Sequence, residues 1–259
     1  MRKRDLKQNP NPASEKAGIA AFLATKLVER LRPKENMPNF VCWALGGALT
    51  GVKPYRNIFF MQTPPSSQAH TMLEIVGEIM GDYAIKVSPS VFKNLKHDKS
   101  LPYRLRGKRM IYCTDFPDNG IISEGVIKTL CDNEEVCLYS SGKIHHIYLP
   151  AKIYIHSTGY PKIVGCEDAV LRRMWFIPVL GNPPATLTDS ALLDSFRKEA
   201  SGILNWLLEG AKWFLEDPNL SENNMPFQEL AEVLREMWIL QMKNPSHRWK
   251  GQTQNKNRL

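Results

Sequence analysis

Paired cysteines are missing from this sequence. Its five cysteines form no CxxC motif and no cysteine–histidine group with zinc spacing; they stand at positions 42, 113, 131, 137 and 166. His145 and His146 are adjacent, so on a strand they point in opposite directions rather than converge on one metal ion. We therefore expect reduced thiols that are mostly buried.

Long apolar runs are missing too. No run approaches the roughly 18 residues needed to cross a bilayer, and the opening MRKRDLKQNPNP lacks the apolar segment of a secretion signal. A hydrophobic content of 43% in 259 residues is nevertheless enough for a sizeable core. The sequence predicts a soluble, intracellular protein without membrane contact, built as one domain or as one core with helical extensions.

The segment IFFMQTPPSSQAHTML (58–73) contains neither glycine nor lysine. It leads from an apolar, strand-like run through polar residues and two prolines into a helical pattern. Phosphate-binding loops of many ATPases lie at such a strand–helix junction and use both missing residue types. The segment therefore raises the question of whether a nucleotide site was lost here or never existed.

Acidic residues are scarce in three basic clusters of a chain whose net charge is +8. The clusters are MRKRDLK at the start, KNLKHDKSLPYRLRGKR at 93–109, and the acid-free KNPSHRWKGQTQNKNRL at the end. Such clusters favour polyanions through counterion release. A solvated surface with frayed ends explains the terminal clusters as well, whereas apolar and aromatic residues are interleaved with the internal one.

Strands and helices alternate along most of the chain, which predicts an α/β fold with a mainly parallel sheet and helices on both faces. Strands are expected at 57–62, 109–114, 152–158 and 174–179, with a hairpin at 136–150 around Ser-Ser-Gly-Lys. Helices are expected from Ser14 to Pro33, at 40–51, from Met72 to Gly81, at 119–131, from Thr188 or Asp189 to Phe214 in one piece, and at 227–242. Residues 1–13 and the tail beyond Pro245 are expected to be disordered.

Five segments, in the same order and with matching gaps, resemble the superfamily 3 helicases, specifically the C-terminal helicase domain of phage, plasmid and poxvirus-type primase-helicases. They are LGGALTGVKPYRNIFFMQ, IVGEIMGDYA, LPYRLRGKRMIYCTDF, YIHSTGYPKIVGCEDAVLRRMWFIPV and GILNWLLEGAKWFLE, which together cover roughly residues 38–217. The resemblance implies a three-layer, AAA+-like P-loop NTPase core, ATP and Mg²⁺ as cofactors, and DNA as a partner.

On this resemblance the chain has four parts. They are a basic disordered start with an N-terminal helix (1–37), the helicase-like core (38–182), a C-terminal helical region (183–244) and a basic flexible tail (245–259). Nothing before residue 38 has the length of a primase, so we expect a separate protein to supply that activity.

The family's phosphate loop, G-x-G-x-N-G-K-[ST]-T, falls on residues 63–71 and is degenerate there. The glycine positions hold Thr63, Pro65 and Gln68, the lysine position holds Ala69, and the Mg²⁺-binding hydroxyl position holds His70 with Thr71 beside it. Proline has no N–H for a phosphate, and alanine carries no charge. The resemblance therefore implies an ATP and Mg²⁺ site that is weak or lost, with only the helix dipole left for an anion.

Other catalytic positions of the family are partly retained. Asp115 matches the Walker B acid, which holds Mg²⁺ when nucleotide binds; an Asp that caps the following turn explains it as well. Thr158 stands at the sensor-asparagine position. Arg172 and Arg173 match the paired arginines, one of which reaches a neighbouring subunit's nucleotide; a salt bridge at an interface or sheet edge is the alternative.

The resemblance also supplies candidates for DNA contact. A hairpin projects basic residues into the pore of these helicases, and SSGKIHH occupies its place. Lys143 at the tip, with His145 or His146, is then a phosphate contact, unless the hairpin is a plain surface feature. A sequence-independent grip on the backbone is expected from Lys93, Lys96, Lys99, Arg104, Arg106, Lys108 and Arg109.

Three functions remain open. The first is a helicase-like module of a phage or plasmid replication protein that has lost ATP hydrolysis. It would bind single-stranded DNA or serve assembly, in a homo-oligomeric ring or beside an active helicase or primase. The expected compartment is the cytoplasm of a bacterial or archaeal cell, or of a virus-infected host. The second is an active ATP-dependent DNA helicase with atypical nucleotide binding, and the third is a structural or interaction protein without helicase function.

Overall fold

The structure is a computed structural model that describes residues 37–53, 56–63, 68–118, 120–132, 135–178 and 188–216. The helices expected from Ser14 to Pro33 and at 227–242 lie outside the described residues, as do both ends of the chain. None of the described helices is long and apolar enough to cross a membrane.

Five strands form the central sheet, in the order β2-β3-β7-β1-β9. They are β1 (Ile58–Gln62), β2 (Ala84–Lys86), β3 (Met110–Phe116), β7 (Lys152–Ser157) and β9 (Met174–Pro178). All four pairings within this sheet are parallel. The expected α/β fold with a mainly parallel sheet is therefore confirmed, and the four strands expected from sequence nearly coincide with β1, β3, β7 and β9.

The side chains of each central strand alternate between two hydrophobic cores. In β1, Phe59 and Met61 belong to one core, and Ile58 and Phe60 belong to the other. Successive side chains of a strand point to opposite faces of the sheet. Because both faces are covered, both sets must be apolar, which explains the unbroken apolar run of this strand.

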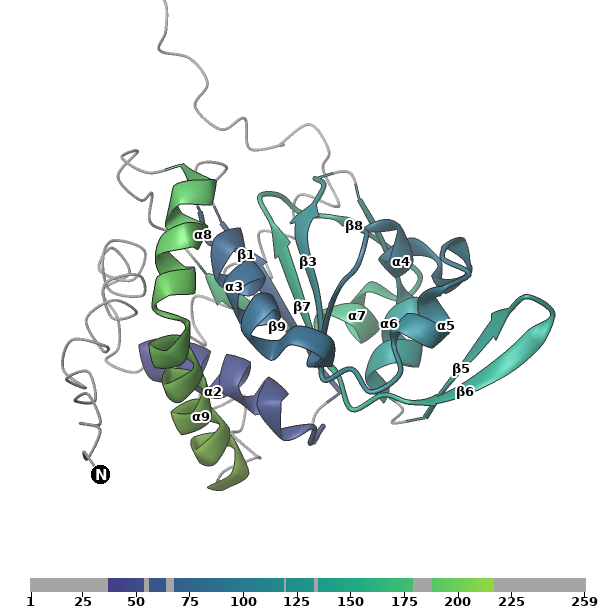
Figure 1. The fold of residues 1–259 in the computed structure, drawn as a ribbon. Helices are drawn as coiled ribbons and strands as arrows, with labels where there is room; N and C mark the ends of the chain where they lie inside the picture. Colours follow the sequence, from purple (N-terminus) through teal and green to yellow (C-terminus); the bar gives the residue numbers. More distant parts are fainter. Residues whose placement is uncertain are drawn as a thin grey trace, which may run out of the picture.

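Helices cover both faces of the sheet, which gives three layers (Figure 1). One face carries α2 (Met37–Thr50), α3 (His70–Met80), α8 (Asp189–Lys198) and α9 (Ala200–Glu216). The other carries α4 (Ser90–Lys93), α5 (Leu101–Arg104), α6 (Glu124–Asp132) and α7 (Glu167–Leu171). Two 3-10 turns, η2 (Gly81–Tyr83) and η3 (Leu95–His97), follow α3 and α4.

The segment 119–131 is only partly the helix that its periodicity predicts. It contains a short strand, β4 (Ile121–Ser123), which pairs in parallel with β8 (Lys162–Val164) before α6 begins at Glu124. Residue 119 lies outside the described residues. The strand forms because its partner, about forty residues further along the chain, lies beside it, and local periodicity carries no information on that partner.

The long helix expected to run to Phe214 is divided in two. Thr188 caps α8 by accepting a hydrogen bond from the N–H of Ala191, which agrees with the expected start. At Glu199 the backbone angles are φ −102° and ψ 12°, outside the helical range, so α8 ends there and α9 begins at Ala200.

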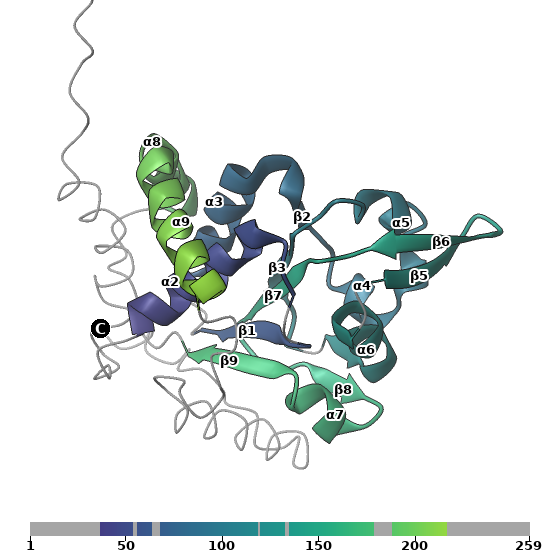
Figure 2. The ribbon, with the colours of Figure 1, turned by 90° about the horizontal axis from the view of Figure 1, so that it is seen from below.

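Strands β5 (Glu135–Ser140) and β6 (Lys143–Tyr148) form the expected hairpin. Ser141 and Gly142 make its two-residue turn with positive φ values of 52° and 78°, as in a type I′ turn. Val136, Leu138 and Ile147 belong to the core on the side of α6. Beyond them the hairpin projects from the body of the protein (Figures 1 and 2).

Two cations lie at the carboxyl end of α2. Lys152 Nζ donates to the carbonyl oxygens of Gly47 and Val52 at 2.7 and 2.5 Å, and Arg109 donates to that of Leu49 at 2.6 Å. A cation is favourable beside the unpaired carbonyls at this end of a helix. Burial, with a smaller effect from a neighbouring lysine, lowers the pKa of Lys152 to about 7.

Two glycines allow α2 and α9 to pack closely. A Cβ added at Gly46 would collide with the backbone of α9, and one added at Gly210 would collide with the carbonyl of Cys42. The Cys42 thiol also donates to the carbonyl oxygen of Trp206 at 3.1 Å. The close approach therefore joins the first described helix to the last.

The substitution Gly210→Ala should lower the free energy of unfolding by about 1–3 kcal/mol. Overpacking against a backbone carbonyl costs about that much, which exceeds the roughly 1 kcal/mol that alanine gains over glycine inside a helix. Gly125→Ala in α6 is the matched control, because a Cβ there meets only Ser123 Oγ, at 3.9 Å. In denaturant titrations the control should be as stable as the parent chain or more so. A Gly210→Ala chain as stable as the control would contradict the packing of α2 on α9.

Candidate functional site

Polar residues gather where the parallel strands of the sheet end. Gln62 and Thr63 lie at the carboxyl end of β1, Ser157 lies at that of β7, and α3 begins at His70. The chain leaves β1 for the edge strand β2 and later returns to β9 on the other side of β1, so the direction of winding reverses at β1. In open parallel sheets, ligands bind at the carboxyl edge beside such a reversal. We therefore take this edge as the candidate site.

Asp115 lies in a β-bulge at this edge. The register between β3 and β7 shifts between Cys113 and Phe116, and the Asp115 side chain is 79% exposed although the rest of β3 is buried. A bulge changes the direction of a side chain and is common beside functional sites. The bulge therefore brings one carboxylate of a buried strand into solvent.

His156 connects β7 to the strands on both sides of it. It is 4% exposed; its Nδ1 donates to the Thr114 carbonyl oxygen in the bulge, and its Nε2 lies 2.8 Å from the Thr63 hydroxyl. A carbonyl can only accept, so Nδ1 carries the proton and Nε2 accepts from Thr63. Burial lowers the pKa of His156, and the imidazole is therefore neutral at pH 7.

The first amide groups of α3 donate within the chain. The N–H groups of Thr71 and Met72 donate to the carbonyl oxygens of Gln68 and Ala69, at 3.0 and 3.1 Å. The Ala69 side chain is buried at 2% exposure. Residues 64–67, which complete the loop, lie outside the described residues.

Asp189, the first residue of α8, places a carboxylate at the amino end of α3. Its Oδ1 accepts from Gln68 Nε2 at 2.9 Å, and its Oδ2 lies 3.3 Å from His70 Nε2. The His70 ring in turn lies 5.7 Å from the His156 ring, measured between centroids. A negative charge is favourable at the amino end of a helix, and here the chain itself supplies one.

Asp115 lies in a small network with a second acid and a lysine. Lys86, the last residue of β2, pairs with Glu74 of α3, and its Nζ lies 3.8 Å from Asp115 Oδ2. Thr114 Oγ1 lies 3.1 Å from a Glu74 oxygen and 3.0 Å from an Asp115 oxygen. Thr114 is buried, but the Lys86 and Asp115 side chains are 46% and 79% exposed. The ion pairs therefore add little stability, but they orient Asp115 toward β2.

Thr158 follows β7 and faces an acid. Its Oγ1 lies 3.4 Å from Asp118 Oδ1, and the neighbouring Ser157 donates to the Phe116 carbonyl oxygen at 2.9 Å. The structure therefore brings several predicted site residues to one edge of the sheet: Thr63, Gln68, Ala69, His70, Thr71, Asp115 and Thr158.

The predicted arginine pair lies at the opposite, amino edge of the sheet. Arg172 and Arg173 directly precede β9, and the Ile58 N–H at the start of β1 donates to the Arg173 carbonyl oxygen at 2.7 Å. Arg173 donates to both carboxylate oxygens of Asp132, at 2.8 and 2.7 Å, whereas Arg172 is exposed. The Arg173 contacts favour the salt-bridge interpretation. Arg172 faces solvent, far from the carboxyl edge of its own chain.

Much of the internal basic cluster is bonded within the chain. Arg104 pairs with Asp98 at 2.7 Å, and Lys108 Nζ donates to the Asp82 carbonyl oxygen at 2.5 Å. Arg109 contacts α2, as described, and lies over the Tyr83 ring at 4.2 Å. Their charges still contribute to the field outside the protein, but their side chains already have partners.

Other cations lie beside the hairpin. The Arg106 guanidinium lies 5.8 Å from the Tyr103 ring centroid, and the Ser140 hydroxyl, next to the hairpin turn, donates to the Lys99 carbonyl oxygen at 2.6 Å. The side chains of Lys99, Arg106 and Lys143 are exposed. The hairpin tip and its surroundings thus carry cations from three segments.

The two hairpin histidines differ in access, as the sequence predicts for neighbours on a strand. His145 is 8% exposed and packs edge-on against Tyr103, with 4.8 Å between ring centroids. His146 is exposed on the other face and contacts Glu135 and Cys137. Of the two, only His146 is accessible to a phosphate.

The cysteines are divided between core and surface. Cys42, Cys113 and Cys131 are buried, as expected, and burial raises the pKa of each thiol to about 12, which makes them unreactive. Cys137 and Cys166 are exposed.

Sequence reasoning missed four residues of the carboxyl edge. His156 shares the α3 face of β7 with Tyr154, so strand parity could have placed it. Glu74 lies one helical turn after His70, so helical periodicity could have placed it as well. No local sequence pattern placed Lys86 or Asp189 at the site. Lys86 is there through its contacts with Glu74 and Asp115, and Asp189 contacts Gln68, which lies 121 positions earlier in the sequence.

Comparison with known proteins supports the fold. No protein-family model matches the chain, and no similar curated protein was found. A solved apo structure of the C-terminal region of NrS-1 is similar, with TM-score 0.49 and 13% identity over 89% of this chain and 54% of that one. A second structure of that region gives TM-score 0.50 and 12% identity over 92% and 67%. The chain therefore spans about half the length of the first, and the second likeness shows a shared fold alone.

The structure predicts that acid weakens the fold through His156. Its folded-state pKa lies below the ordinary value of about 6.5, so below pH 6.5 the unfolded chain binds the proton more readily. Stability is therefore lost as the pH falls, by up to about 1.4 kcal/mol per unit. His156→Asn, whose amide can still donate to Thr114, should reduce that slope in denaturant titrations from pH 7 to pH 5. Equal slopes for the two chains would show that His156 does not titrate as a buried group.

Proposed function

We propose that this chain is a helicase-like module of a DNA replication protein that holds single-stranded DNA and does not hydrolyse ATP. Its sequence motifs support the helicase relationship, and its sheet and helices form a compatible three-layer core. The observation that carries the loss of ATP hydrolysis is the Asp189 carboxylate at the amino end of α3, where it contacts Gln68 and His70.

The negative charge of Asp189 at the amino end of α3 opposes the binding of a triphosphate. The phosphate groups of a nucleotide would lie at the amino end of the helix that follows β1, next to Asp189. Two like charges about 4 Å apart repel by about 1 kcal/mol in bulk water and by about 4 kcal/mol near a protein surface. The position of the phosphate-loop lysine holds Ala69, which is buried and supplies no compensating charge.

Among the described residues of this loop, hydrogen-bond donors are scarce as well. A phosphate loop works because its amides are unpaired and point at the ligand. The N–H groups of Thr71 and Met72 instead bond to Gln68 and Ala69, and Thr63, at the first glycine position, bonds to His156. The donor set is therefore a poor fit to ATP.

The candidate metal ligand also has a competing partner. Asp115 lies beside Lys86, whose ammonium carries charge of the same sign as Mg²⁺. The removal of one good electrostatic group from a catalytic site typically costs about 3 kcal/mol or more of transition-state stabilisation. Several such changes together support a chain without turnover.

The hairpin and its surroundings support contact with DNA. Lys143, Lys99 and Arg106 are exposed near its tip. Three tyrosines of or beside the hairpin are more than half exposed: Tyr103 at 55%, Tyr139 at 59% and Tyr148 at 61%. Cations bind the phosphate backbone without regard to sequence, and aromatic rings stack on unpaired bases. This combination favours single-stranded over double-stranded DNA.

The full chain should show no saturable binding of a fluorescent ATP analogue with Mg²⁺ up to millimolar concentration. Nucleotide affinity should appear when the loop is restored by Thr63→Gly, Pro65→Gly, Gln68→Gly, Ala69→Lys and His70→Thr together. Adding Asp189→Asn to that chain should tighten binding about tenfold, because a repulsion of about 1.4 kcal/mol is removed.

Asp194→Asn is the control for this titration. It removes the same charge from the same helix, but Asp194 pairs with Arg197 and not with α3. Micromolar binding by the unmodified chain, with hydrolysis stimulated by DNA, would instead identify an active helicase. An equal effect of Asp189→Asn and Asp194→Asn on nucleotide affinity would show that the position of the Asp189 carboxylate does not matter.

Binding to a labelled single-stranded oligonucleotide should weaken steeply with salt, as measured by fluorescence anisotropy. Lys143→Gln should lower affinity and reduce the slope of log K against log salt by about 0.7, the value for one phosphate contact on a single strand. Lys128→Gln on α6 is the control, because Lys128 pairs with Glu124 on its own helix. No binding at low salt, or an equal loss for the two variants, would favour an interaction protein without DNA contact at the hairpin.

A further inference from the structure

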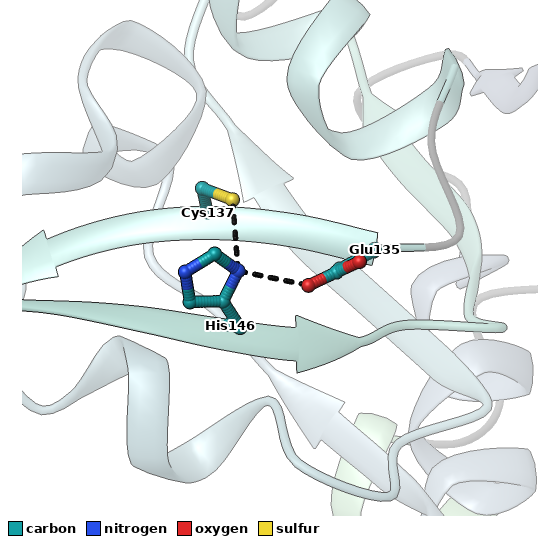
Figure 3. Close-up of side chains that lie close together, drawn as sticks. All are labelled: Glu135, Cys137 and His146. Atoms are coloured by element: carbon teal, nitrogen blue, oxygen red, sulfur yellow. Dashed lines mark hydrogen bonds and ion pairs between the residues drawn. The ribbon is translucent and has the colours of Figure 1, made fainter.

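Three side chains of different chemistry converge on the outer face of the hairpin. Cys137 of β5 lies directly opposite His146 of β6, and Glu135 lies two residues before Cys137, on the same face. His146 Nδ1 lies 3.4 Å from Cys137 Sγ and 2.8 Å from a Glu135 oxygen. Figure 3 shows the thiol and the carboxylate both facing the same nitrogen of the imidazole.

We propose that Glu135, Cys137 and His146 bind a Zn²⁺ ion. Thiolate, imidazole and carboxylate are the three side-chain ligand types that zinc takes in proteins. The single thiolate with one nitrogen and one oxygen suits Zn²⁺ better than Mg²⁺ or Ca²⁺, which prefer oxygen alone. On binding, the thiol gives its proton to water and its sulfur donates an electron pair to the metal, with no change of oxidation state.

The distances are close to those of a tetrahedral site. Zinc bond lengths of about 2.0–2.3 Å place neighbouring ligand atoms about 3.3–3.6 Å apart. The Sγ–Nδ1 separation is already 3.4 Å, and all three ligand atoms lie within 4.8 Å of one another. The Glu135 oxygen must withdraw by about 0.5 Å from Nδ1 to reach the tetrahedral spacing. Its side chain is 66% exposed and free to do so.

A histidine–glutamate ion pair is the simpler interpretation, and it leaves the cysteine unexplained. An exposed pair of that kind contributes little to stability and needs no third group. The Cys137 thiol nevertheless faces the same nitrogen, Nδ1, that the Glu135 carboxylate faces. The three electron-pair donors lie within 4.8 Å of one another, which is close enough for all of them to bind one metal ion.

Solvent can supply a fourth ligand, because Glu135, Cys137 and His146 are all exposed. A cavity of about 250 Å³ lies beside Cys137, between β5, α6 and residues 94–96, and is lined by neither Glu135 nor His146. Three protein ligands and a water molecule would complete tetrahedral coordination, as in zinc sites that keep an open position. The bound ion would also connect β5 to β6, and so hold the hairpin in one conformation.

The test uses Co²⁺ and Zn²⁺ with the full chain, kept reduced by a phosphine. Co²⁺ should bind in one equivalent, with a thiolate-to-cobalt charge-transfer band in the near ultraviolet and visible bands of tetrahedral intensity. Zn²⁺ should displace it. Cys137→Ser should abolish the charge-transfer band and weaken Zn²⁺ binding at least about 100-fold, since even outer-shell partners contribute 10–100-fold.

Matched variants decide the outcome. His146→Gln and Glu135→Gln should also weaken Zn²⁺ binding, whereas Cys166→Ser, which removes the other exposed cysteine, should change nothing. Circular dichroism should show all four chains folded, because these side chains lie on the surface. A parent chain without the charge-transfer band, or a Cys137→Ser chain that binds Zn²⁺ as tightly as the parent, would overturn the proposal. The result does not depend on whether the chain binds nucleotide.

Discussion

The parallel pairing of β1 with both β7 and β9 is the constraint on which the rest of the structure depends. Parallel strands need covered faces, because the connections between them place helices there, and their carboxyl ends must all meet at one edge. That edge therefore collects the polar chain ends at Gln62 and Thr63, the bulge at Asp115 and the amino end of α3. The sheet thus produces a site-like arrangement of polar groups whether or not a ligand uses it.

Fewer basic side chains are available to bind a polyanion than the net charge indicates. The net charge is +8, but several basic side chains form hydrogen bonds inside the protein: Lys152 and Arg109 at the end of α2, and Arg173 with Asp132. Each satisfies carbonyl or carboxylate oxygens that would otherwise be left without a partner in a buried or half-buried place. Among the described residues, Lys99, Arg106 and Lys143 beside the hairpin are exposed and remain accessible to a polyanion.

Periodicity and resemblance predicted the layers, four central strands and the hairpin, because these depend on burial patterns that repeat every two or 3.6 residues. They did not predict β4, which exists through its partner β8, or the break at Glu199. At the candidate site, the resemblance assigned Thr63, His70, Asp115 and Thr158 to a nucleotide site, and the structure places these residues at one edge of the sheet. Periodicity and resemblance could not reveal that Asp189 lies against His70, because a contact between distant segments leaves no local pattern.

The turn at Ser141 and Gly142 has a consequence for how this hairpin can change length. Its two positive φ values fix which residues oppose each other, so one residue added to a single strand would turn every later side chain of that strand to the opposite face. Cys137 and His146 would then lie on different surfaces. The hairpin can therefore grow only by matched pairs of two residues on each strand, which moves the tip outward by about 7 Å each time. The length of the hairpin can thus change only in discrete steps, while Cys137 and His146 stay opposite each other.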